Sequence, residues 1–345
     1  MDHSSDRSLA LPAPGPSHVG EALSGPVDYE QLASELLRAL RGKRSQVAFS
    51  RRLGRRSNVA YAWESGRRFP TAAEAMRAAA LVGFDVDAAL DRFAKVHAPF
   101  FEGGDPREPG TMAALLRALQ ASTPTTEIAK RAERSRFAVS RWLSGTAEPR
   151  LPDFLRMLQA TARGALTFIA CFVAPTKLPS AKTQWMRQQA ADAVVRQHPH
   201  FTLLLVGLGL TSYRELSRHE PGFLARELGL TVDEVESGLE AMAKAELIRW
   251  NGRRWAIDAD AEVDLRRDPE MRDEMRRWIT RRSAEAIGKA DEGLFQWVAL
   301  SCSEEEMLEL QREARALYER VRAIATSDGA DRAVVFNLQL FPTKG

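Results

Sequence analysis

The stretch QVAFSRRLGRRSNVAYAWESG, residues 46–66, decides the fold of the N-terminal part of the chain. Ser45 precedes it and can cap a helix, because its hydroxyl can accept a hydrogen bond from the first helical turn. Gly54 can adopt the left-handed conformation that ends a helix. We therefore predict one helix over 46–53 and a second over 57–63, joined by a tight turn.

Apolar residues flank this stretch on both sides. Leu32, Leu36, Leu37 and Leu40 recur at the spacing of one helix face, and 75–82 is again apolar at that spacing. These patterns predict one helix before the turn and another packed behind it.

The same pattern returns 79 residues later in TTEIAKRAERSRFAVSRWLSG, residues 125–145. The positions that coincide are Trp63 and Trp142, Ser65 and Ser144, Gly66 and Gly145, Pro70 and Pro149, Phe93 and Phe172, Arg52 and Arg131, and Arg55 and Arg134. Agreement of tryptophan, glycine and proline without a gap seldom arises by chance, so we interpret residues 111–173 as a second copy.

These residues resemble the helix-turn-helix of phage repressors, the XRE family, which has Gln early in the second helix, Leu-Gly at the turn and Trp-Glu-x-Gly after the recognition helix. The first copy matches at Gln46, Leu53, Gly54, Trp63, Glu64, Gly66 and Pro70. It departs from the pattern at Ala60, where the family has a larger aliphatic residue, and at Arg56, where a capping serine is common. The second copy has Ser135 and Val139 there, but carries Thr125, Ala132-Glu133 and Leu143 at the other family positions.

The resemblance implies binding to double-stranded DNA, with the third helix in the major groove and the second across the backbone. The side chains expected to reach bases are Ser57, Asn58, Tyr61, Arg136, Phe137, Ser140 and Arg141. Asparagine can form hydrogen bonds with adenine and arginine with guanine, and Phe137 can contact a thymine methyl group. The side chains expected to hold phosphates are Gln46, Arg55, Arg67, Arg68, Arg134 and Arg150, and Arg56 completes the DNA-binding set.

Charge in the first copy agrees with this expectation. The chain has a net charge of only +3, but residues 41–68 hold nine basic residues and one acid, Glu64. Helix-turn-helix units also dock proteins, and helical arginines often form only a solvated face. The alternative is therefore a protein-protein adaptor whose units bind no DNA.

Composition indicates a globular protein: 44% of residues are apolar and 28% are charged, so most of the chain is expected to fold without a partner. Residues 1–27 lack hydrophobic periodicity and are expected to be a disordered tail. No apolar run is long enough for a membrane span, and Cys171 and Cys302 form no metal or disulfide pattern. We expect a cytoplasmic, nucleoid-associated protein.

A winged helix is expected over 180–258. Residues 221–228 predict a short helix ended by Gly229, and Thr231 with Glu234 forms a capping box for a longer one. Asn251-Gly252 predicts a hairpin. The second helix is acidic, so this unit is expected to serve packing or dimerisation rather than DNA contact. The apolar run 201–210 suits either a strand or a buried helix.

The last part, 259–345, is expected to be a small α/β unit. Residues 294–302 and 334–341 have strand character, and Ser303 with Glu306 caps a helix between them. From about Ser180 to Pro342 the order of elements resembles an uncharacterised bacterial regulator-like family, described as a domain of unknown function. The resemblance implies a sensing or dimerisation region, with a homodimer formed through it, and identifies no effector.

The predicted fold class is mainly α and multidomain: a helix-turn-helix domain over 28–97, a linker over 98–110, a second such domain over 111–174, a winged helix and an α/β unit. No catalytic, metal-binding or cofactor-binding motif is present, so we expect no enzyme, no metal and no cofactor.

Overall fold

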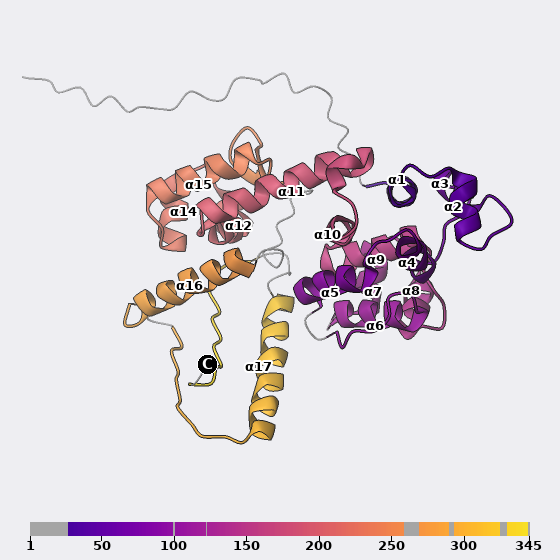
Figure 1. Ribbon diagram of the computed structural model, residues 1–345. Helices are drawn as coiled ribbons and strands as arrows, with labels where there is room; N and C mark the ends of the chain where they lie inside the picture. Colours follow the sequence, from indigo (N-terminus) through magenta and orange to yellow (C-terminus); the bar gives the residue numbers. More distant parts are fainter. Residues whose placement is uncertain are drawn as a thin grey trace, which may run out of the picture.

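The computed structural model describes residues 27–98, 101–121, 123–258, 269–289, 293–324 and 330–343. This part of the chain is mainly helical, with seventeen α-helices, one 3-10 helix and one two-stranded sheet. Two apolar cores organise it, one built from residues between 32 and 181 and the other from residues between 191 and 275. Helix α11 (Pro179–Gln197) runs between the two groups of helices (Figure 1). The mainly α fold class predicted from the sequence is confirmed.

The first helix-turn-helix unit has five helices: α1 (Tyr29–Arg41), α2 (Gln46–Arg52), α3 (Val59–Glu64), α4 (Ala72–Leu81) and α5 (Val86–His97). Ser45 caps α2 by accepting from the N–H of Ala48, as predicted. Gly54 follows α2 with φ near +70°, also as predicted. The third helix begins at Val59, two residues later than expected, because Asn58 rather than Arg56 provides its cap.

The second unit repeats this order in α6 (Pro109–Gln120), α7 (Thr125–Arg131), α8 (Arg136–Ser144), α9 (Leu151–Ala162) and α10 (Ala165–Ala170). The starts of α7, α9 and α10 lie 79 residues after those of α2, α4 and α5. Ser135 caps α8 and Gly145 ends it in the left-handed conformation. Three of the five pairs of helices therefore begin in the register predicted from the sequence.

The two units pack against each other through equivalent elements. Helix α9 packs on α1 and α4, α6 packs on α4, and α10 packs on α5. Thr71 and Arg150, which are equivalent positions, form an isolated antiparallel bridge. Their helices contribute to one continuous apolar core, so the pair forms a single body.

The segment after the second unit contains a 3-10 helix, Pro175–Lys177, that leads directly into α11. Ala181 of α11 lies in the first core, whereas Ala191 and Val195 lie in the second. Ser180 donates its backbone N–H and its hydroxyl to the carboxylate of Glu35 in α1, at 3.0 and 2.7 Å. The predicted boundary near Ser180 thus falls inside a helix shared by both halves.

The winged-helix region contains α12 (Phe201–Gly209), α13 (Thr211–Glu215), α14 (Pro221–Leu228), α15 (Val232–Lys244), β1 (Ile248–Trp250) and β2 (Trp255–Ile257). The apolar run 201–210, which the pattern could not assign, is mostly helical. The capping box of Thr231 and Glu234 is present, and β1 pairs antiparallel with β2 across the predicted Asn251-Gly252 turn.

The C-terminal region contains α16 (Pro269–Ala286) and α17 (Glu304–Ile324). The predicted capping box of Ser303 and Glu306 begins α17. The predicted strands were wrong: 294–302 and 334–341 are not helical and form no sheet with each other or with another described segment. Both segments are rich in apolar residues, but neither has a neighbouring strand to supply backbone hydrogen bonds. The turn expected at Asp328-Gly329 lies outside the described residues.

No helix in the described part of the chain is both long enough and apolar enough to cross a membrane. The homodimer expected from the sequence stays a prediction.

Candidate nucleic-acid interface

Helix α3 presents a polar, exposed surface around its N-terminus. Ser57, Asn58 and Tyr61 are all exposed, and Tyr61 retains 45% of its accessible surface. Opposite this face, Ala60 and Trp63 pack into the core. Ala60, a small residue that is unusual for the family that the first unit resembles, is fully buried there.

Asn58 has a structural task that its sequence position did not indicate. Its Oδ1 caps α3 by accepting from the N–H of Tyr61 at 3.2 Å and also lies 3.2 Å from the hydroxyl of Ser50. Bidentate pairing with adenine needs both the amide oxygen and the amide nitrogen. Since the oxygen is engaged, only the amino group is placed to meet a base.

Gln46 was predicted to hold a phosphate, but its amide nitrogen donates to Glu64 at 2.9 Å. Arg41 also donates to Glu64, at 3.0 Å through Nη2, so the three side chains tie α1, α2 and the end of α3 together. Burial raises the pKa of Glu64, but hydrogen bonds from Arg41 and Gln46 outweigh this effect and leave the pKa below its usual value. The same bond raises the pKa of Arg41. The pair is therefore charged at neutral pH.

This network decides the charge of the surface around the turn. Glu64, the only acid in residues 41–68, is buried and neutralised internally. Of the nine basic residues in this stretch, all except Arg41 are exposed. The acid therefore removes almost nothing from the positive charge that faces solvent.

The predicted phosphate-binding arginines of the first unit differ in their availability. Arg56, Arg67 and Arg68 are exposed, and the guanidinium of Arg67 lies 5.1 Å from the ring centre of Tyr61. Arg55 is exposed but lies 3.4 Å from the carboxylate of Glu74, which offsets its charge.

Helix α8 carries the corresponding surface of the second unit. Arg136, Phe137, Ser140 and Arg141 are all exposed, and Phe137 keeps 72% of its accessible surface. The guanidinium of Arg141 lies 5.6 Å from the ring centre of Phe137. Helices α3 and α8 thus each display an aromatic ring with an arginine beside it, although the two rings occupy different positions.

Arg134 and Arg150 were predicted to bind phosphates, but both contribute to packing. Arg134 pairs with Asp153 at 2.7 Å and lies 3.7 Å from Glu30. Arg150 donates to the carbonyl of Phe69 at 3.2 Å, which links the two units. The sequence pattern could not reveal this, because the partners lie outside the repeated turn.

The winged helix differs in charge from the two helix-turn-helix units. The exposed side of α15 carries Asp233, Glu236 and Glu240, and the last is paired with Lys244. The hairpin has two exposed arginines, Arg249 and Arg253, whereas Arg254 donates to the carbonyl of Leu216. This acidic helix is poorly suited to meet a phosphate backbone.

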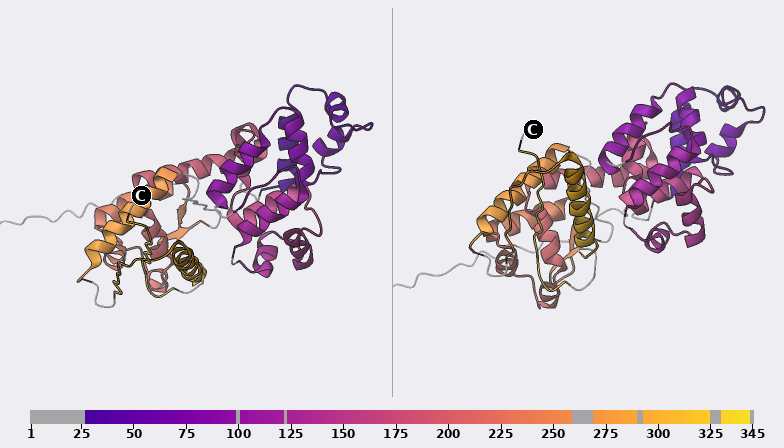
Figure 2. Two further views of the ribbon diagram at one scale, coloured as in Figure 1. Left: turned by 60° about the horizontal axis from the view of Figure 1, so that its bottom comes forward. Right: turned by 90° about the horizontal axis from the view of Figure 1, so that it is seen from below.

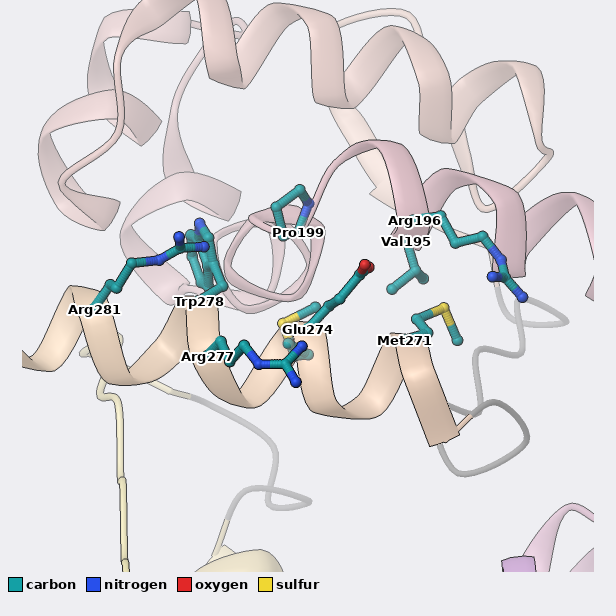
Figure 3. Close-up of a pocket in the computed structure, with 9 residues that line it drawn as sticks. Val195, Arg196, Pro199, Met271, Glu274, Arg277, Trp278 and Arg281 are labelled. Carbon is teal, nitrogen blue, oxygen red and sulfur yellow. The ribbon is translucent and has the colours of Figure 1, made fainter.

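A small pocket lies between α16 and the end of α11. It is lined by Val195, Arg196, Pro199, Met271, Glu274, Met275, Arg277, Trp278 and Arg281 (Figure 3). Glu274 points from α16 into the space between Pro199 and Val195. In the part of the chain described, no group of three or more His, Cys, Asp or Glu residues is arranged to hold a metal ion.

None of the curated proteins and none of the solved structures matches the chain, but one family model does. The region that matches this family model begins in α11 and includes the winged helix, α16 and α17. It leaves out both helix-turn-helix units. Residues 180–343 match the family model described as "Domain of unknown function (DUF4423)", in agreement with the resemblance to an uncharacterised domain noted in the sequence.

Proposed function

We propose that the protein is a sequence-specific DNA-binding regulator of transcription that contacts DNA through α3 and α8. The observation that carries the proposal is the charge of the first unit. Its turn region exposes eight basic side chains while its single acid is buried against Arg41. A dense positive surface beside an exposed recognition helix is suited to the phosphate backbone.

The exposed residues divide into two roles. Arg56, Arg67 and Arg68 are placed to hold phosphates and fix the position of the first unit. Arg136 and Arg141 on α8 can each donate two hydrogen bonds to a guanine, and Phe137 can contact a thymine methyl group. In this assignment the first unit supplies more of the affinity and the second more of the base reading.

The stacked arginines support this assignment. Arginine over an exposed ring gains about 0.5–1 kcal/mol. The ring restricts the rotamers of Arg67 and Arg141 while their N–H groups remain able to donate, so the entropy cost of binding DNA is smaller.

The proposal is tested by mapping the DNA bound by the full chain across its genome and measuring the affinity for the most enriched fragment by fluorescence anisotropy. We expect Arg136→Ala with Arg141→Ala to weaken binding, roughly 5- to 150-fold for each arginine that pairs with a guanine, corresponding to about 1–3 kcal/mol. The matched control is Arg312→Ala with Arg320→Ala, which removes two exposed charges from α17.

The control pair is expected to bind like the wild type. If both double variants weaken binding equally, α8 does not read bases. If no fragment is enriched, the protein is not a sequence-specific DNA-binding regulator.

One observation favours an adaptor that binds protein instead. Phe137 is a large apolar ring that is mostly exposed on α8, and such side chains often anchor protein interfaces. Under this alternative, Phe137→Ala abolishes capture of a protein partner while DNA mapping yields no enriched fragment.

A further inference from the structure

The contacts between the two helix-turn-helix units are reciprocal. The N–H of Leu151 donates to the carbonyl of Pro70 at 2.9 Å, and the N–H of Ala72 donates to the carbonyl of Pro149 at 3.3 Å. Pro70 and Pro149 are equivalent positions of the repeat, as are Ala72 and Leu151. Each hydrogen bond is therefore the image of the other, which is the signature of a two-fold interface.

Other contacts obey the same relation. The bridge between Thr71 and Arg150 joins two equivalent positions, as does the hydrogen bond of 3.0 Å from Arg92 to the carbonyl of Cys171. A residue that meets its own equivalent must lie near the axis. The two units therefore form a pseudo-two-fold dimer within one chain.

We infer that this pair acts as one rigid, unequal DNA-binding head, which contacts two inverted half-sites of a single duplex with one protein chain. The inference rests on the proposed DNA binding and adds the form of the site. Two recognition helices related by a two-fold axis match half-sites related by the local two-fold axis of DNA.

Rigidity follows from how the units are joined. Met76 and Ala79 of α4, and their equivalents Leu155 and Leu158 of α9, are all at most 2% exposed in one shared core. The ring centres of Phe93 and Phe168, one from each unit, lie 5.3 Å apart. A hinge between the units would expose this core, so the distance between α3 and α8 is fixed.

Both recognition helices lie outside this interface. Helix α3 packs on α1 and α2 of its own unit, and α8 packs on α6 and α7 of its own. The α2–α3 and α7–α8 hairpins lie on different sides of the shared core (Figures 1 and 2). Their exposed faces therefore take no part in the contact between the units.

The two faces are not alike. At equivalent positions, Ser57 corresponds to Arg136, Asn58 to Phe137, Tyr61 to Ser140 and Ala62 to Arg141. Each of these outward pairs differs in residue type. The half-sites must then differ in sequence, and the guanine-rich half is the one beneath α8.

The first experiment selects binding sequences for the full chain from a random duplex long enough for several helical turns. We expect a two-part motif with inverted, unequal halves whose centres lie about 10–10.5 bp apart or a multiple of it. Native mass spectrometry of the selected duplex is expected to show one chain for each pair of half-sites. Two chains on a symmetric site, or a motif with one half only, would overturn the inference and leave DNA binding intact.

The second experiment inserts about 5 bp or about 10 bp between the halves of the selected duplex, which rotates them by half a turn or a full turn. A rigid head is expected to bind the duplex more weakly after either insertion. Its affinity should fall to that for an isolated half-site. Recovery at the full-turn insertion would overturn the inference, because it shows that the units move independently.

Variants assign each half to its helix. Arg136→Ala with Arg141→Ala is expected to erase base preference in one half only, and Ser57→Ala with Tyr61→Ala in the other half only. The control pair in α17 is expected to leave both halves unchanged. Loss of base preference in both halves with either pair contradicts the inference, whereas failure of the wild-type chain to bind any duplex contradicts the proposed function itself.

Discussion

At the scale of residues, Glu64 shows why the two copies look imperfect. The second unit has Gln120, Thr125 and Leu143 where the first has Arg41, Gln46 and Glu64. The sequence shows the changes at 125 and 143 as separate departures from a pattern. The structure brings all three first-unit side chains together, so they form one buried polar network that the second unit lacks. No spacing rule could reveal this, because the three residues belong to three helices.

The network predicts a strongly non-additive set of variants. Glu64→Leu alone leaves Arg41 without its partner and is expected to destabilise the protein by roughly 3 kcal/mol, as when a buried ion pair loses one member. Adding Arg41→Gln and Gln46→Thr, which copies the second unit, is expected to recover at least half of that stability. Equilibrium urea denaturation measures both variants, and equal destabilisation by the single and triple variants would contradict the network.

The lowered pKa of Glu64 predicts a dependence on pH. Because the folded-state pKa lies below the ordinary value of 4.5, the unfolded chain binds the proton more readily. The stability contributed by this carboxylate is complete above pH 4.5 and is lost as the pH falls through the folded-state pKa. The difference in Tm between the wild type and Glu64→Gln should therefore shrink as the pH falls below 4.5. A difference that is constant with pH would show that Glu64 is not charged in the folded protein.

At the scale of elements, most caps and turns were predictable, with the Asn58 cap of α3 as an exception, but packing partners were not. Ser45, Gly54 and the Thr231 capping box act locally, so the sequence alone indicated them. The run 201–210 was ambiguous because its helix, α12, is held by tight contacts with distant helices. An added Cβ at Gly207 would lie 2.8 Å from Leu228 of α14, and one at Gly238 of α15 would lie 2.9 Å from the ring of His200.

Substitution of glycine by alanine is therefore expected to have opposite effects at a crowded position and at an open one. Gly238→Ala should cost about 1–3 kcal/mol through overpacking, although alanine is the better helix former. Gly209→Ala, at the end of α12 where an added Cβ meets nothing within 4 Å, should be neutral or stabilise by up to about 1 kcal/mol. Thermal unfolding of the full chain compares the two, and a stabilised Gly238→Ala variant would show that α12 and α15 are not closely packed.

At the scale of the whole molecule, the sequence predicted the order of the parts and the repeat, but not how they are joined. A constant offset of 79 residues shows duplication and says nothing about contact between the copies. Their two-fold relation comes from contacts such as Thr71 with Arg150, and the continuity between the two halves comes from α11, which enters both cores. The strands expected near the C-terminus failed for the same reason, since the apolar character of 294–302 and 334–341 cannot provide a neighbouring strand.

The most direct test of DNA binding by the basic face is the salt dependence of the affinity of the full chain. Each phosphate contact contributes roughly −0.9 to the slope of log affinity against log salt concentration, so Arg56, Arg67 and Arg68 together account for roughly −2.7. We predict a steeply negative slope for the wild type, a slope shallower by about that amount when all three arginines are changed to alanine, and no change for Arg312→Ala with Arg320→Ala. An affinity that does not respond to salt, or a slope unaffected by the three substitutions, would contradict the claim that this basic face binds DNA.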